Sequence, residues 1–195
     1  MWQQLLPALR MTALMTVLTG LIYPLAVTGL VQLVFPGKAN GSLVRKDGKI
    51  IGSSLIGQNF TKPQYFHPRP SAAGNDGYDP TASGGSNLGP TSQKLVDRVK
   101  TSVDQFHKDN PESTGPIPAD LLTTSASGLD PHISPAAAEA QIARIAATRH
   151  VGPEMLQALV ASHTESPDLG FLGEARVNVL LLNLDLDEKF PISAK

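Results

Sequence analysis

The chain combines 195 residues, sixteen basic and seventeen acidic side chains and no cysteine, for a formal net charge of −1. This near balance argues against a nucleic-acid-binding protein, which normally shows an excess or a patch of basic residues. The lack of cysteine excludes disulfide bonds, thiolate catalysis and cysteine-ligated zinc sites.

The first predicted element is a membrane-spanning helix over residues 11–36, preceded by a short terminus of residues 1–10. Apart from the phenol of Tyr23 the run has no ionisable side chain, and about 25 helical residues are enough to cross a bilayer core of ~30 Å. A secretory signal peptide is one alternative, but the run is too long and no Ala-x-Ala cleavage site follows it. A buried core helix is another, although such helices rarely run this far without charge. The basic residues flanking the run leave its orientation undecided.

The predicted span carries small or polar residues at every fourth position. Such a row lets helix backbones approach closely in lipid and offers hydrogen bonds between helices. It therefore predicts a surface that packs against other membrane helices, although these residue types are also ordinary in membrane spans. Its proline is expected to kink the helix near the middle. The row comprises Thr12, Thr16, Gly20, Pro24, Thr28 and Gln32.

The remaining residues, 40–195, are expected to form one soluble domain. An Asp-Gly pair between β-forming residues predicts a hairpin over residues 42–52, followed by a long loop over residues 58–92 whose aromatic residues favour a functional role. Hydrophobic periodicity and helix-start signals then predict helices, and a run of apolar residues near the end predicts a buried strand. The fold class is thus α+β or α/β, attached to a single N-terminal transmembrane helix. The predicted helices cover residues 92–108, 118–122 (a short turn), 134–149 and 153–162, and the strand covers residues 177–186.

Few patterns in the sequence indicate catalytic chemistry. There is no P-loop, no Gly-x-Gly-x-x-Gly and no His-Glu-x-x-His motif. Residues 84–89 come close to a nucleophile elbow, but the glycine two positions after the serine is missing, and a tight glycine loop is the simpler interpretation. His163 and Glu165 are a candidate base with an orienting partner. An independent hydrolase would need Ser86 to meet His132 or His163.

Several polar segments nevertheless form an ordered set along the chain. Together with the N-terminal span, they resemble the C subunit of the Kdp potassium-transporting P-type ATPase over essentially the whole sequence. The segments are Arg69-Pro70-Ser71-Ala72, Ser83-Gly84-Gly85-Ser86-Asn87-Leu88-Gly89-Pro90, Pro118-Ala119-Asp120-Leu121, Ser127-Gly128-Leu129-Asp130-Pro131-His132-Ile133-Ser134-Pro135-Ala136-Ala137-Ala138, His163-Thr164-Glu165, Leu169-Gly170-Phe171-Leu172-Gly173 and Arg176-Val177-Asn178-Val179-Leu180.

The resemblance implies a single-pass subunit of a bacterial inner membrane, with residues 1–10 in the cytoplasm and residues 40–195 in the periplasm. The implied partners are a channel-like potassium-translocating subunit, a P-type ATPase subunit and membrane lipid, with no nucleic acid. The implied role is that of an accessory subunit without a catalytic site, covalent cofactor or metal of its own. It would stabilise the assembly and act as a catalytic chaperone that raises the ATP affinity of the ATPase subunit. The alternatives are an independent membrane-tethered periplasmic hydrolase and an interaction module.

The resemblance also implies two sets of site residues. The first is a loop faintly similar to the signature loop of ABC-type ATPases, and hence a candidate ATP contact: Ser83, Gly84, Gly85, Ser86 and Asn87. The second set is drawn from all the motif segments and shares Asn87 with the first: Arg69, Asn87, Asp130, His132, Ser134, His163 and Glu165. Because no phosphate-cradling motif with its lysine is present, the residues themselves favour a structural role, with the domain covering the potassium entrance. Asp76, Asp79 and Asp130 would then collect cations, although each is equally suited to starting a turn.

Overall fold

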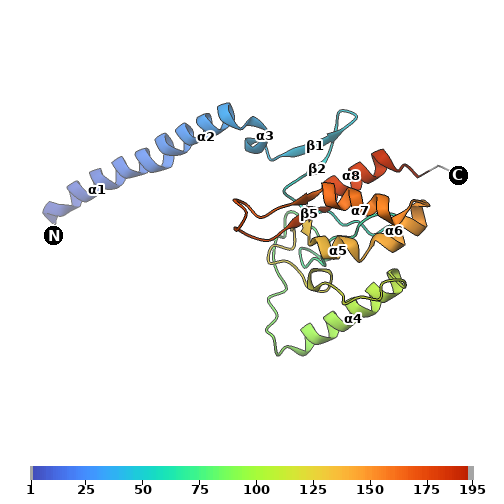
Figure 1. The fold of residues 1–195 in the computed structure, drawn as a ribbon. Coiled ribbons are helices and arrows are strands. Elements are labelled where there is room, and N and C mark those ends of the chain that lie inside the picture. The colour runs from blue at the N-terminus through green and yellow to red at the C-terminus, as the bar shows by residue number, and fades with distance from the viewer. Residues whose placement is uncertain (1, 193–195) are drawn as a thin grey trace. The chain divides into compact units, whose positions relative to one another are not determined.

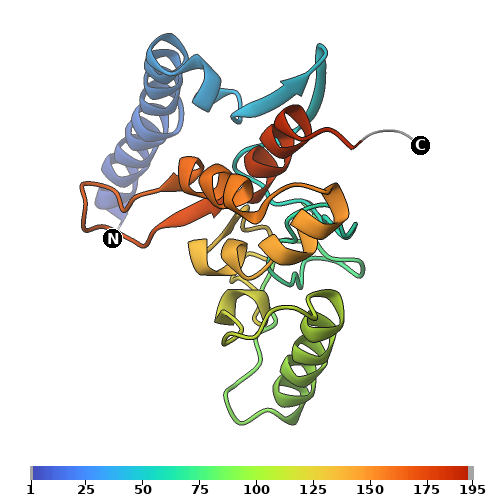
Figure 2. The ribbon, with the colours of Figure 1, turned by 45° about the vertical axis from the view of Figure 1, so that its right-hand side comes forward.

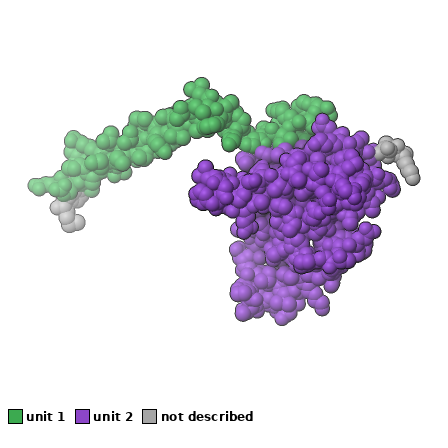
Figure 3. Space-filling model, in the orientation of Figure 1, with its two compact units in different colours: residues 1–51 green, residues 52–195 purple. Residues whose placement is uncertain are grey.

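A computed structural model describes residues 2–192 of the chain (Figure 1). The chain divides into two compact units, Met1–Ile51 and Gly52–Lys195, which Figure 3 shows in different colours. The division falls inside the second strand of a hairpin, residues 49–53, rather than directly after the apolar helix, so the first unit holds more than the predicted span.

The first unit is dominated by one continuous helical segment. It comprises α1 (Trp2–Val17), the π-helical turn η1 (Leu18–Ile22) and α2 (Tyr23–Val34). Among the described residues, Gln3–Val34 is the one helix long and apolar enough to cross a membrane, and it spans 32 residues. The predicted long apolar N-terminal helix is therefore confirmed. The π turn lies directly before Pro24, where the proline ring removes a hydrogen bond and crowds the preceding turn.

A short helix, α3 (Pro36–Ala39), and most of a hairpin complete the first unit. The hairpin pairs β1 (Leu43–Lys46) with β2 (Lys49–Ser53). Asp47 and Gly48 both have positive φ, 50° and 77°, as a type I′ turn requires. The hairpin prediction is confirmed.

The second unit begins with a long stretch without helix or strand between β2 and α4, as predicted for the loop over residues 58–92. Helices and a small sheet follow, which confirms a mixed helix and sheet domain. The sheet is antiparallel, with strand order β3-β5-β4, and pairs Ile133 and Thr164 with Val177 from opposite sides. The elements are α4 (Gln93–Asp109), η2 (Ala119–Leu121), β3 (His132–Ile133), α5 (Pro135–Glu139), α6 (Ile142–Arg149), α7 (Pro153–Ser162), β4 (Thr164–Glu165), β5 (Arg176–Asn178) and α8 (Val179–Lys189).

The helix predicted over residues 134–149 begins as expected but is split in two. Ser134 caps α5, its hydroxyl oxygen accepting a hydrogen bond from the Ala137 N–H at 3.0 Å, with Pro135 in the first turn. At Gln141 the hydrogen-bond pattern changes to the i, i+3 type, because the Gln141 N–H donates to the Ala138 carbonyl at 3.0 Å. Helix α6 then begins at Ile142.

The strand predicted over residues 177–186 is wrong beyond residue 178. Asn178 ends β5 and caps α8, because its side-chain oxygen accepts a hydrogen bond from the Leu181 N–H at 3.2 Å. The apolar run itself suggested a buried strand. The buried side chains instead follow helical spacing, and they are Val179, Leu180, Leu182, Asn183 and Leu186.

The core of the second unit lies where α5, α6, α7 and α8 pack together and against the sheet (Figure 2). Leu156, Val177 and Leu182 are fully buried in it. Helix α4 lies apart from this group of helices in the same view. Phe66 of the long loop and Ile133 of the motif segment over residues 127–138 also belong to this core, so it anchors both.

Candidate functional site

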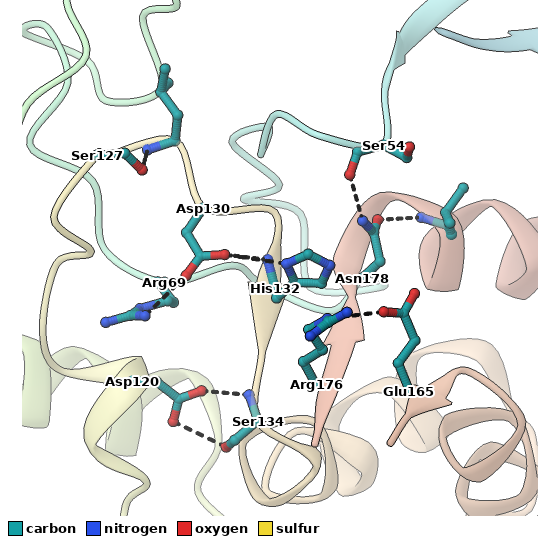
Figure 4. A network of polar contacts seen from close by, with 12 residues as sticks. Ser54, Arg69, Asp120, Ser127, Asp130, His132, Ser134, Glu165, Arg176 and Asn178 are labelled. Atoms are coloured by element: carbon teal, nitrogen blue, oxygen red, sulfur yellow. Dashed lines mark hydrogen bonds and ion pairs between the residues drawn. The ribbon is translucent and has the colours of Figure 1, made fainter. Parts of the chain in front are cut away.

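Asp130 is the centre of the polar network that joins the motif loops (Figure 4). One of its carboxylate oxygens accepts a hydrogen bond from Arg69 Nη1 at 3.0 Å, and the other accepts from the His132 N–H at 3.0 Å. Burial raises the pKa of this carboxyl, but hydrogen bonds from His132 and the charge of Arg69 outweigh burial and hold the pKa below its usual range. Arg69, Asp130 and His132 thus come together in the folded domain.

Asp120 ties the short turn η2 to the start of α5. Its carboxylate accepts hydrogen bonds from the Ser134 N–H at 2.7 Å and from the Ser134 hydroxyl at 3.1 Å. The same hydroxyl oxygen caps the helix, so Ser134 is fully engaged in holding the backbone.

A cavity of about 490 Å³ opens between this network and β5. Its lining contains side chains of both signs, so it offers no strong preference for anions or cations. The ionisable lining residues are Arg69, Asp120, Asp130, His132, Glu174 and Arg176. Among the described residues, no group of three or more histidine and carboxylate side chains is placed to hold a metal ion.

Ser71 fastens the long loop to the loop that contains Gly128. Its hydroxyl donates to the Gly128 carbonyl at 2.6 Å and accepts from the N–H groups of Ala73 and Tyr78. Tyr78 in turn donates its hydroxyl to the Arg69 carbonyl at 2.7 Å, and burial, followed by the nearby charge of Asp130, raises the pKa of the phenol. The irregular loop is therefore fastened by side chains rather than by a strand ladder.

Close packing between the two motif loops explains the glycine at position 128. Gly128 has a φ of +66°, and a Cβ atom there would lie 2.7 Å from the Gly84 carbonyl oxygen and 2.8 Å from the Ala73 Cβ. The Gly84 N–H donates to the Ser127 carbonyl at 2.8 Å, and the Ser83 hydroxyl donates to the same oxygen at 3.0 Å. Two donors of the predicted ATP-contact loop are thus used inside the domain.

The other end of that loop lies open. Gly85 and Ser86 line a cavity of about 510 Å³ together with Lys94 and Arg98 of α4. Arg98 Nε is buried and has no hydrogen-bond partner within the domain. Asn87 adopts a left-handed backbone with a φ of +50°. Neither His132 nor His163 lines this cavity, so the pairing of Ser86 with a histidine that a hydrolase would need is not formed there.

His163 and Glu165 are directed to different partners. His163 Nε2 lies 2.7 Å from Asp185 Oδ2, which also accepts from Lys189 Nζ at 2.7 Å. Although burial raises the pKa of Asp185, those hydrogen bonds outweigh it and lower the pKa. Glu165 instead accepts from Arg176 Nε at 2.9 Å across the β4–β5 pair. The predicted combination of base and orienting group is therefore not formed.

The aspartates proposed to collect cations are mostly engaged locally. Asp130 is paired with Arg69 at 3.0 Å. One carboxylate oxygen of Asp79 accepts from the N–H and the hydroxyl of Thr81, as a turn-starting aspartate does, and the Thr81 hydrogen bonds lower its pKa. For these two residues the turn interpretation describes the structure better than a cation-collecting surface.

Two side-chain amides hold the backbone of Phe66 and His67 in an arrangement that was not predicted from the sequence, and we call it the clamp. The Phe66 N–H donates to the Asn183 side-chain oxygen at 2.9 Å, and the Asn183 amide donates back to the Phe66 carbonyl at 2.9 Å. Gln141 does the same for His67, at 2.7 Å and 3.2 Å. Two side-chain amides thus replace the neighbouring strand that this buried backbone would otherwise need.

Two arginines of α6 extend the clamp. Arg149, whose side chain is fully buried, donates to the Gln64 carbonyl at 2.8 Å and to Asp187 at 2.7 Å, and its guanidinium lies over the Tyr65 ring. Arg144 donates to the carbonyls of Pro63 and Tyr65. An arginine and a glutamine within an alanine-rich helix were the signals that could have indicated a buried polar role.

The predicted helix-packing row lies entirely on exposed surface of the first unit. Thr12, Thr16, Gly20, Pro24, Thr28 and Gln32 are all exposed. A Cβ atom at Gly20 would meet just one atom within 4 Å, Thr16 Cγ2 at 4.0 Å. The chain itself therefore leaves this row uncovered, and the helix-packing role stays a prediction.

Comparison with known proteins gives consistent matches. The family model described as "KdpC: K+-transporting ATPase, c chain" matches residues 5–188. A relative from Koribacter versatilis (strain Ellin345) is 58% identical over 193 residues, covering 98% of both chains. One from Myxococcus xanthus is 56% identical over 191 residues, covering 97% of this chain and 90% of the relative. Both are named "Potassium-transporting ATPase KdpC subunit".

Proposed function

Since the chain belongs to the KdpC family, the c chains of K+-transporting ATPases, we propose that it is a non-pumping subunit that stabilises such a complex in the membrane. In this proposal Gln3–Val34 crosses a bacterial inner membrane, and the second unit lies on the periplasmic side. Its partners are the P-type ATPase subunit, a channel-like potassium-translocating subunit and the surrounding lipid.

The observation that carries the proposal is the apolar helix that the family match includes. None of its most apolar window is buried within the chain, and its large side chains, such as Leu14 and Leu25, are exposed. So much exposed apolar surface on one helix requires lipid or other membrane helices as its environment. The row of small and polar residues supports neighbouring membrane helices along its length.

The side-chain contacts of the second unit favour a scaffolding role over a catalytic one. Its motif residues are hydrogen-bonded to one another: Asp130 to Arg69, Ser134 to Asp120 and Glu165 to Arg176. Such a network fixes loop positions at the surface, which is useful for a subunit that must present a defined shape to its neighbours.

Co-purification tests this proposal. The chain carries a C-terminal tag and is expressed with the other subunits of its transport ATPase, and the membranes are solubilised in mild detergent. We expect those subunits to be recovered with it and potassium-stimulated ATP hydrolysis to fall when the chain is omitted. A tagged chain that is recovered alone and monodisperse would contradict the proposal.

The side of the membrane can be tested because the chain has no cysteine. Thr114, exposed in the connection between α4 and η2, is replaced by cysteine and treated with a membrane-impermeant maleimide. Periplasmic placement predicts labelling of spheroplasts from outside, whereas labelling only after lysis indicates the cytoplasmic side.

A second proposal, that the chain raises the ATP affinity of the ATPase subunit by touching the nucleotide, is favoured by the cavity beside Gly85 and Ser86. Lys94 and Arg98 supply two cations there, and the Arg98 Nε lacks a partner within the domain. Replacing both cations by alanine should then raise the KM for ATP of the complex several-fold, while Lys100→Ala on the exposed side of α4 should not. An unchanged KM, or periplasmic labelling at residue 114, would count against direct contact.

A further inference from the structure

The loop between β4 and β5 displays three large apolar side chains to solvent. Leu169 is 83% exposed, Phe171 75% and Leu172 50%. They lie within four residues of one another in the turn closed by Asp168 and Leu172, and we call them the apolar tip. Figure 2 shows the loop projecting beyond the helices of its unit. An exposed apolar group of this size in a folded domain is typical of an interaction site.

The backbone of the tip forms a turn that is closed by hydrogen bonds. The N–H of Asp168 donates to the Leu172 carbonyl and the N–H of Leu172 donates to the Asp168 carbonyl, both at 2.9 Å. Leu169 has a φ of +54°, a backbone conformation that costs a leucine energy, and Gly170 follows at +82°. Leu169 therefore combines a strained backbone with the most exposed side chain of the turn.

Charged residues at the base of the loop fix its position and set its electrostatics. Arg176 is paired with Glu165 at 2.9 Å and lies 3.8 Å from Asp168. Glu174 is a further exposed carboxylate. The loop and its two flanking strands thus carry three carboxylates, Glu165, Asp168 and Glu174, against the single guanidinium of Arg176, which gives the base of the tip a net negative charge.

This charge distribution decides between two kinds of partner. Segments that insert into bilayers combine apolar residues with lysine or arginine, because bacterial and other membranes carry anionic headgroups. An acidic surround opposes that mode of binding and favours a basic protein surface.

We propose that Leu169, Phe171 and Leu172 form a knob that docks into an apolar pocket with a basic rim on another subunit of the K+-transporting ATPase. This inference rests on the proposed function, since it requires that the chain assembles with those subunits. The apolar side chains supply the buried contact, and Glu165, Asp168 and Glu174 orient it through the basic rim.

Site-specific photo-crosslinking tests the identity of the partner. A photoreactive benzoylphenylalanine replaces Phe171 in the full chain, which is expressed with the other subunits and illuminated in native membranes. The matched control carries the same group at Met155, a residue of α7 that is 54% exposed. We expect an adduct with one other subunit from position 171 and none from position 155. An adduct with lipid, an adduct with a second copy of this chain, or no adduct above the control would overturn the proposal.

A pair of variants tests the energetic contribution of the knob. In Leu169→Ser/Phe171→Ser the folded domain loses no buried contact, so its thermal unfolding should match that of the wild type. The recovery of other subunits per tagged chain under extended washing should fall about tenfold, the effect of ~1.4 kcal/mol on a binding constant. Met155→Ser should leave recovery unchanged. If the wild type recovers no other subunit, the proposed function itself fails; if the wild type and the double variant recover them equally, only the knob fails.

Discussion

Replacing Asn183 by alanine provides the sharpest test of the clamp that holds the long loop. Asn183 is 2% exposed, and its amide pairs with both the N–H and the carbonyl of fully buried Phe66. Alanine leaves both backbone groups without a partner. At about 1–3 kcal/mol for each unsatisfied buried group, the free energy of unfolding should fall by about 4 kcal/mol. For a domain of this size that lowers Tm by roughly 10 °C.

The assay is thermal unfolding of the full chain in detergent, followed by circular dichroism at 222 nm. Asn59→Ala is the matched control, because Asn59 makes one exposed hydrogen bond to the Asp76 carbonyl, and its Tm should change by less than about 2 °C. Asn183→Leu restores the lost volume without restoring the hydrogen bonds, and it should be as unstable as Asn183→Ala. Wild-type stability in the leucine variant would refute the reasoning, since filling space would then be sufficient.

Three further predictions follow from other parts of the molecule. Gly128→Ala should cost about 2–4 kcal/mol, because its Cβ meets backbone and its φ is positive, and urea unfolding should show this against Gly115→Ala, where nothing lies within 4 Å. Asp130 has a folded-state pKa below its ordinary value, so its stabilisation is complete above pH ~4 and is lost as pH falls through the folded pKa; the unfolding free energy of Asp130→Asn, measured by urea titration, should therefore decline less between pH 5 and pH 3 than that of the wild type. Leucine at both Thr16 and Gly20 should reduce recovery of partner subunits several-fold while leaving domain unfolding unchanged, and equal recovery would argue against the packing row.

Local signals in the sequence were sufficient where the structure is decided locally. Asp47 and Gly48 specified their hairpin turn, and Ser134 with Pro135 specified a helix start, because each involves neighbours within a few residues. The end of β5 was misjudged because Asn178 serves both as the last strand residue and as a helix cap. Periodicity alone does not separate these roles when the run is short and strongly apolar.

The clamp and the glycine junction could not be predicted for a different reason. Gln141 and His67 are 74 residues apart, and nothing in either local sequence names the other as a partner. Likewise, Gly128 must be a glycine because the Gly84 backbone lies against it, which is a property of the folded loops. The motifs were therefore recognisable as special, while their largely structural reason became visible only in three dimensions.

The clamp also has a consequence for biosynthesis. Phe66 obtains its hydrogen-bond partners from Asn183, 117 residues later, and Arg149 obtains its charged partner from Asp187 in the last helix. While the ribosome is still making α8, the Phe66 backbone lacks both of its partners, and the Pro63–His67 segment has at most those that Gln141, Arg144 and Arg149 supply. The apolar N-terminal helix, by contrast, emerges first and is complete in itself. The chain should therefore be inserted into the membrane well before its second unit can close, and truncation within α8 should leave an inserted chain whose domain never folds.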